Sequence, residues 1–106
     1  MTSPSQPPIF VLQCLVAGTS HLPVAGLQPP LLVDQPLQLE RQASNKHDAL
    51  AVRVFRGEDH LGYLPRDKNE VVARLMDAGK QFSARLLQVQ AEGQWLKLEI
   101  GVWLED

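Results

Sequence analysis

Short blocks in which apolar and polar residues alternate cover most of the chain, and such alternation is typical of half-buried β-strands. Ile9 to Val16 is an apolar run rich in β-branched residues, which predicts a first strand that ends at residues 17–20. Residues 21–30 contain three prolines and one glycine and therefore predict a loop. Residues 31–40 alternate best near their end, which predicts a second strand that is interrupted at Pro36.

Two hairpins are predicted further along the chain. Their four strands cover residues 51–55, 60–64, 82–90 and 94–104. The first hairpin turns at Arg56 to Asp59 and the second at Ala91 to Gly93, and in both turns a glycine permits the tight backbone conformation. Together with the two strands before them, the hairpins bring the predicted number of strands to six.

One helix is predicted between the hairpins, over about residues 67–78. Asp67 and Glu70 have the spacing of a capping box, and Gly79 is typical of a helix end. Apolar residues at helical spacing line one face of it: Val71, Val72, Leu75 and Met76. Six short strands around one core, with a helix closing an end, predict a mainly β fold with minor α, a small and partly open barrel of the OB-like or SH3-like kind.

The length of 106 residues and an ordinary composition favour one domain. Hydrophobic residues make up 44% and charged residues 21%, which indicates neither a disordered chain nor a membrane protein. The proline-rich segment 1–8 predicts a disordered tail, and residues 9–106 then form the domain. The sequence has no apolar run of membrane-spanning length and no signal-peptide pattern, so we expect a cytoplasmic protein without a membrane partner.

The charges are unevenly distributed, although the net charge is only −2. Residues 1–40 contain no lysine or arginine. Residues 41–86 contain nine basic and six acidic residues, whereas residues 87–106 contain one basic and four acidic residues. We therefore expect any site for an anion in the middle segment.

Neither a metal site nor a catalytic centre is indicated. The soft metal ligands are one cysteine and three histidines, and no two of them have a zinc-like spacing: Cys14, His21, His47 and His60. The single cysteine also excludes an intrachain disulfide, and its apolar surroundings predict that it is buried. We expect no cofactor.

A catalytic reading would pair His47 with Asp48 or Asp59, but adjacent side chains of an extended segment point to opposite faces. There is no nucleophile elbow and no phosphate-binding glycine loop, so we expect no catalytic residues and no enzyme. Trp95 and Trp103 are eight residues apart in the last strand and should share one face. We expect them to pack in the core or at its rim rather than to bind a ligand.

A long polar connection, residues 42–48, joins two of the predicted strands. A connection that only had to turn would be shorter and richer in glycine. Asn45 and Asp48 are suited to tying the loop by side-chain to backbone hydrogen bonds, which leaves Lys46 and His47 free to point outward. A self-contained surface turn and a binding loop both satisfy this composition.

The order and spacing of several short motifs resemble the HIRAN domain family, whose pattern is L-x-R-x-x-x-N-x-x-D-x-x-A-x-x-V followed by G-Y-L-P. This chain has Leu39-x-Arg41, Asn45-x-x-Asp48, Ala51-Val52-x-Val54 and Leu61-Gly62-Tyr63-Leu64-Pro65 in that order. Upstream, Val16-Ala17-Gly18-Thr19 resembles the end of the family's first strand. The likeness covers roughly residues 9–104. Within the family, the chain resembles the stand-alone bacterial members.

The resemblance implies a DNA-binding module whose pocket holds the 3′-hydroxyl end of single-stranded DNA, as found at damaged DNA or stalled replication forks. Asp48 matches the acid that meets the 3′-hydroxyl, and a carboxylate accepts a hydrogen bond from a hydroxyl but repels a terminal phosphate. His47 matches an aromatic residue beside it, Tyr63 matches the pocket wall, and Arg66 falls near a basic residue that meets phosphate. The implied DNA-binding residues are Ser20, His21, Asn45, Lys46, His47, Asp48, Tyr63 and Arg66.

Two positions depart from the DNA-binding members, which have arginine and tyrosine where this chain has Ser20 and His21. His47 also stacks less well than tyrosine, and stacking contributes about 1–3 kcal/mol per base. An acidic chain forgoes the general attraction of phosphate backbones. These departures favour an alternative, a protein-interaction module that kept the barrel and lost the DNA pocket. Under the first hypothesis, a helicase or nuclease is a further partner to expect.

Overall fold

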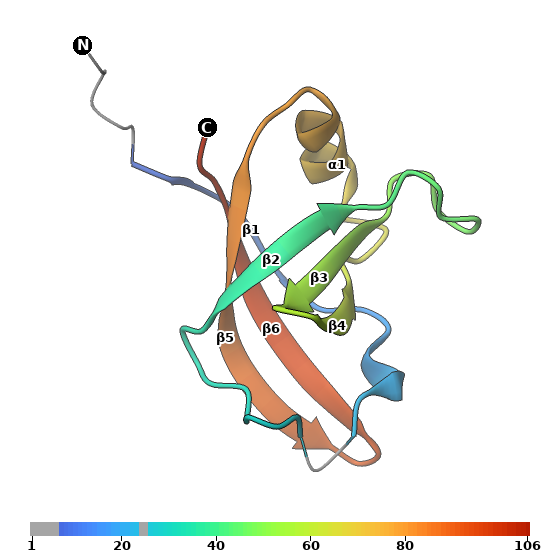
Figure 1. The fold of residues 1–106 in the computed structure, drawn as a ribbon, viewed down its shortest axis with the longest axis vertical. Coiled ribbons are helices and arrows are strands. Elements are labelled where there is room, and N and C mark those ends of the chain that lie inside the picture. Colours follow the sequence, from blue (N-terminus) through green and yellow to red (C-terminus); the bar gives the residue numbers. More distant parts are fainter. Residues whose placement is uncertain (1–6, 24–25) are drawn as a thin grey trace.

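The computed structural model describes residues 7–23 and 26–106, which form six strands and two short helices (Figure 1). In chain order the elements are β1 (Ile9–Leu15), the 3-10 helix η1 (Thr19–His21), β2 (Pro36–Arg41), β3 (Val52–Arg56), β4 (Asp59–Tyr63), α1 (Glu70–Asp77), β5 (Phe82–Glu92) and β6 (Trp95–Leu104). The predicted order of strands, hairpins and helix is confirmed.

The six strands pair antiparallel in the order β1-β6-β5-β2-β3-β4. The two edges of this sheet meet just after β1, where the Ala17 N–H donates to the Tyr63 carbonyl at 2.8 Å and the Tyr63 N–H donates back at 2.9 Å. The sheet therefore curls into a half-barrel, and α1 lies at one end of it (Figure 1). This confirms the predicted mainly β fold.

The core follows from the alternation of buried and exposed positions in the strands. Val52 and Val54 on β3 are fully buried, as their shared face predicts. On β6 every second side chain enters the same core: Leu96, Leu98, Ile100 and Val102. Cys14 is also buried, as predicted, and this burial raises the pKa of its thiol to about 11.

Gly62 lies where the half-barrel closes, and the space there admits no side chain. A Cβ atom at this position would lie 2.2 Å from the Ala17 carbonyl oxygen and 2.7 Å from Cγ1 of Val16. Glycine is the residue that permits such close backbone approach. The glycine of the G-Y-L-P motif is therefore needed to join β4 to the chain after β1.

Helix α1 begins later than the sequence predicts, since Asn69 rather than Asp67 is its N-cap residue. The preceding residues form a turn in which the Lys68 N–H donates to the Pro65 carbonyl at 3.0 Å. Asp67 lies inside this turn, two residues before the N-cap position. The prediction of a capping box starting at Asp67 is therefore wrong.

Two other elements differ in detail. The second strand begins at Pro36 and is not interrupted there, and the preceding Leu32 and Val33 are 63% and 59% exposed. Within the helix, Val72 is fully buried, but Val71 is 59% exposed. Val71 therefore does not belong to the packed face that the spacing predicts.

Trp95 and Trp103 share one face of β6, as predicted, but this face points away from the core. Trp103 covers Gly101, where a Cβ atom would lie 2.7 Å from the Cη2 atom of the indole. Its ring also meets Phe10 edge-on at a centroid distance of 5.4 Å. Trp95 is 39% exposed. Of the two expected places, the core and its rim, Trp103 therefore occupies the rim.

The tail predicted for residues 1–8 lies outside the described residues except for its last two, Pro7 and Pro8. In the part of the chain that is described, no helix has the length and apolar character needed to cross a bilayer.

Candidate functional site

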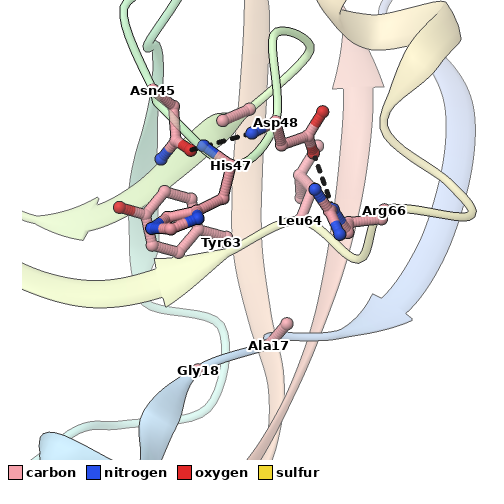
Figure 2. A pocket seen from close by; sticks show the side chains of 9 residues that line it. Ala17, Gly18, Asn45, His47, Asp48, Tyr63, Leu64 and Arg66 are labelled. Carbon is pink, nitrogen blue, oxygen red and sulfur yellow. Dashed lines mark hydrogen bonds and ion pairs between the residues drawn. The ribbon is translucent and has the colours of Figure 1, made fainter.

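A pocket of about 280 Å³ opens where the end of β1, the loop 42–48, β4 and the turn after β4 come together (Figure 2). It is lined by Ala17, Gly18, Asn45, His47, Asp48, Ala51, Tyr63, Leu64 and Arg66. The polar members of this lining are all residues that the sequence proposes for binding. Motifs that lie far apart in the sequence therefore converge on one cavity.

The loop 42–48 is held in a bent conformation by the Asn45 side chain. Asn45 Oδ1 accepts hydrogen bonds from the N–H groups of His47 at 2.8 Å and Asp48 at 3.0 Å. Asp48 Oδ1 in turn accepts one from the Leu50 N–H at 2.9 Å. The prediction that Asn45 and Asp48 tie the loop is confirmed. The segment is bent and not extended, and both His47 and Asp48 line the pocket, but their side chains point to different sides of it, as expected (Figure 2).

Gln42 connects this loop to β4. Its Oε1 atom accepts hydrogen bonds from Asn45 Nδ2 at 2.9 Å and from the Tyr63 hydroxyl at 3.1 Å. A single amide oxygen thus holds one residue of the loop and one residue of β4. The positions of the loop and of the tyrosine are therefore coupled.

The Asp48 carboxylate is fixed from several directions. Besides the bond from Leu50, its Oδ2 atom accepts a hydrogen bond from Asn69 Nδ2 at 2.8 Å, and Arg66 Nε lies 3.7 Å away. The hydrogen bond from the Leu50 N–H is the main cause that lowers the pKa of Asp48, followed by Asn69 and the charge of Arg66. The pocket therefore contains an ionised carboxylate at neutral pH.

The other functional groups surround this carboxylate. Figure 2 shows the rings of His47 and Tyr63 toward one side of the pocket, and Asp48 with Arg66 toward the other. The Arg66 side chain is 71% exposed, so its guanidinium is free to reach an anion at the pocket mouth. Flat rings, a hydrogen-bond acceptor and a cation thus face one cavity.

An aromatic cluster supports Tyr63 from behind. The His60 ring lies edge-on to Tyr63 at a centroid distance of 5.1 Å, and it also lies 5.1 Å from Phe55 and 5.8 Å from His21. Burial is the main cause that lowers the pKa of His60. His60 therefore supports the pocket wall as a neutral aromatic ring at physiological pH.

Ser20, His21 and Lys46 do not line the pocket. The ring nitrogens of His21 lie 3.0 Å from the Gly18 carbonyl and 2.8 Å from the His60 carbonyl, which holds the ring against the backbone. Ser20 lines a neighbouring hollow of about 470 Å³ that shares Gly18 with the pocket. Lys46 is an exposed residue of the loop.

Sequence reasoning assigned no role to three residues that shape the site: Arg41, Gln42 and Asn69. Arg41 donates to the carbonyls of Ala49 at 2.7 Å and Ala51 at 3.0 Å, and it pairs with Asp77 of α1 at 3.0 Å. The presence of Arg41 in the family's sequence pattern could have indicated that it has a role in the site. Asn69 contacts Asp48 across 21 residues, and no local pattern predicts such a contact.

The pocket brings together groups that are suited to non-covalent binding. Its ionisable side chains are His47, Asp48, Tyr63 and Arg66. Throughout residues 7–23 and 26–106, no three His, Cys, Asp or Glu side chains gather closely enough to hold a metal ion. The arrangement can stack a flat group, accept a hydrogen bond from a hydroxyl and pair with an anion.

Comparison with known proteins agrees with this fold. The HIRAN domain family model matches residues 9–105. A protein from Lactobacillus plantarum has a solved structure with a TM-score of 0.77 and 27% identity, over 94% of this chain and 98% of that one. The HIRAN domain of human HLTF has a TM-score of 0.71 and 16% identity, over 93% of this chain and 80% of that one. No curated protein sequence matches.

Proposed function

This chain belongs to the HIRAN domain family, and on that premise we propose that it holds the 3′-hydroxyl end of single-stranded DNA in the pocket beside Asp48. The family is known for DNA binding, which supports a nucleic acid as the ligand. The chemistry of the pocket supports the kind of end. Such ends occur at damaged DNA and at stalled replication forks, where a helicase or nuclease would be the protein partner.

The observation that carries this proposal is the state of the Asp48 carboxylate. Its side chain is only 20% exposed, its pKa is lowered chiefly by the bond from the Leu50 N–H, and it lines the pocket. An ionised carboxylate accepts a hydrogen bond from a terminal hydroxyl, and each of its oxygens has a second lone pair to offer. The same charge repels a terminal phosphate at close range.

The neighbouring groups fit the rest of a terminal nucleotide. Tyr63 and His47 offer ring faces on which a base stacks without regard to its sequence. Arg66 lies at the mouth with an exposed guanidinium, where it is placed to pair with the next phosphate along the strand. These groups supply binding and leave the DNA chemically unchanged, so we propose a binding module and not an enzyme.

One observation favours a second candidate, a protein-interaction module on the same barrel. The His21 ring is held by the carbonyls of Gly18 and His60 and does not line the pocket. One stacking face that the resemblance implies is therefore missing from the cavity. A domain that recognises a protein would have no need of it.

Fluorescence anisotropy with short labelled oligonucleotides, identical except for a 3′-hydroxyl or a 3′-phosphate, tests the first candidate. We expect the protein to bind the hydroxyl end at least about tenfold more tightly, because a 3′-phosphate in the pocket would lie next to the negatively charged Asp48 carboxylate. Asp48→Asn should lose this preference. Asp67→Asn, which removes an exposed carboxylate of the turn outside the pocket, should keep it.

Equal affinity for the two ends would contradict the proposed recognition of a hydroxyl. Absence of binding at low salt would contradict DNA binding altogether and would leave the protein-interaction candidate.

A further inference from the structure

Asn69 occupies a position where its side chain would ordinarily serve the helix. It is the N-cap residue of α1, and asparagine is favoured there because its side-chain oxygen accepts a hydrogen bond from the first turn. In this protein the side chain makes no such bond. It is 1% exposed, and its amide nitrogen donates to Asp48 Oδ2 at 2.8 Å. The buried amide of Asn69 thus forms its hydrogen bond with a residue that lines the pocket and not with its own helix.

The second neighbour of that oxygen is Arg66, and its contact is of another kind. Its Nε atom lies 3.7 Å from Asp48 Oδ2, near the outer limit of an ion pair, and its side chain is 71% exposed. A guanidinium that paired fully with the carboxylate would neutralise its charge. The amide of Asn69 stabilises the carboxylate and leaves its charge intact.

From this difference we infer that Asn69 is a positioning residue that sets the preference for a hydroxyl end, because its bond to Oδ2 holds the Asp48 carboxylate in the pocket lining, where Arg66 reaches the same oxygen only at 3.7 Å. The inference rests on the proposed function. Without the amide, the carboxylate is free to pair more closely with Arg66. It then aims no acceptor at the terminal hydroxyl, and its neutralised charge no longer repels a phosphate.

The roles of the two neighbours are therefore separable. Asn69 acts on the ratio of the affinities for the two kinds of end. Arg66 acts on both affinities together, because its target is a phosphate inside the strand. Arg66→Ala should weaken binding to both oligonucleotides by a similar factor and leave the ratio within about twofold of that of the wild type.

Two variants distinguish positioning by Asn69 from a merely structural role. Asn69→Ala removes both the amide and any capping group. Asn69→Ser restores a hydroxyl that is well suited to cap the helix, but this hydroxyl is one bond too short to reach Asp48. The serine variant should therefore be more stable than the alanine variant to thermal unfolding, and both should lack the bond to Asp48.

The test is the ratio of the dissociation constants for 3′-phosphate and 3′-hydroxyl oligonucleotides, measured by anisotropy for the wild type and both variants. We expect the ratio to fall about tenfold in both variants, the factor that corresponds to one hydrogen bond to a charged group. A ratio that stays at the wild-type value in the folded serine variant would overturn the inference. A wild type without any preference would instead overturn the proposed function on which the inference rests.

A readout without DNA completes the test. In the Arg66→Ala background, where no guanidinium replaces the lost amide, the carboxyl carbon of Asp48, followed by NMR against pH, should titrate at a higher pH after either substitution of Asn69 than before it. An unchanged titration would overturn the inference even if DNA binding had changed.

Discussion

At the scale of single residues, Gly62 shows how the fold and the site depend on the same atoms. Its backbone lies against that of Ala17, and the paired N–H and carbonyl groups of Ala17 and Tyr63 close the half-barrel beside it. Tyr63 is a wall of the pocket, and Ala17 lines its floor. A residue with no side chain therefore positions two residues that contact the proposed ligand.

Gly62→Ala should lower the free energy of unfolding by about 1–3 kcal/mol, because the new Cβ atom must displace the Ala17 backbone. Urea denaturation followed by tryptophan fluorescence measures this. Gly57→Asn is the matched control, since Gly57 has a positive φ of 57° that asparagine tolerates and a Cβ atom there would meet no other atom within 4 Å. Equal effects of the two substitutions would show that the closure at Gly62 is not tight.

His60 should make stability depend on pH. Burial is the main cause that lowers its folded-state pKa below the ordinary value of 6.5, so the unfolded chain binds more protons than the folded one in the window below 6.5. This contribution is complete above pH 6.5 and is lost as the pH falls through that window.

His60→Phe keeps an aromatic ring between Phe55 and Tyr63 but cannot be protonated. The loss of stability between pH 7.5 and pH 5 should therefore be smaller in this variant than in the wild type, as measured by thermal unfolding. An equal loss would show that other groups cause the dependence.

At the scale of elements, the site depends on how the loop 42–48 is anchored to its surroundings. Arg41 uses its guanidinium to hold the carbonyls of Ala49 and Ala51 and the carboxylate of Asp77 on α1. Its side chain is 15% exposed. The planar fork of arginine suits such multiple contacts, and a lysine ammonium cannot reproduce them.

Arg41→Lys should therefore lower the free energy of unfolding by about 1–3 kcal/mol and weaken DNA binding through the displaced loop. Arg85→Lys is the control, because Arg85 is exposed and, among the described residues, its guanidinium makes a single hydrogen bond, to the Asp34 carbonyl. The prediction fails if denaturant unfolding and anisotropy do not distinguish the two variants.

The strands were predictable because each carries its own pattern. Val52 and Val54 share one face with Arg53 between them on the other, and the turn at Gly57 has its glycine in the expected place. The start of the helix was not predictable in this way. Asp67 and Glu70 have the spacing of a capping box, but Asp67 belongs to the turn that follows Pro65. Local patterns compete there, and a sequence alone does not show which one prevails.

The site was predictable only where its contacts are local in the sequence. The bonds from Asn45 to its neighbours are local, so the loop's self-contained hydrogen bonding followed from its residue types. The contact between Asp48 and Asn69 depends on how α1 docks beside the loop, which only the folded chain determines. The bend of the loop at His47 and Asp48, which the sequence analysis treated as extended backbone, is likewise determined by the folded loop.

At the scale of the whole molecule, the charges favour a short-range mode of recognition. The polar residues of the pocket come from the middle segment, where nine basic residues outnumber six acidic ones, whereas the chain as a whole has a net charge of −2. Long-range attraction of a polyanion is therefore weak. Under the proposed function, affinity must therefore come from the groups that touch the end of the strand, which agrees with a pocket and not with an extended groove.

The central claim, that the pocket beside Asp48 receives the 3′-hydroxyl end of DNA, is tested most directly by NMR. A 15N-labelled protein is titrated with an unlabelled oligonucleotide that ends in a 3′-hydroxyl, and the backbone amide shifts are mapped on the structure. We predict that the largest changes fall on residues 45–48 and on Tyr63, Leu64 and Arg66. Largest changes on the outer face of β6 around Trp103, or no changes at saturating oligonucleotide, would contradict the claim.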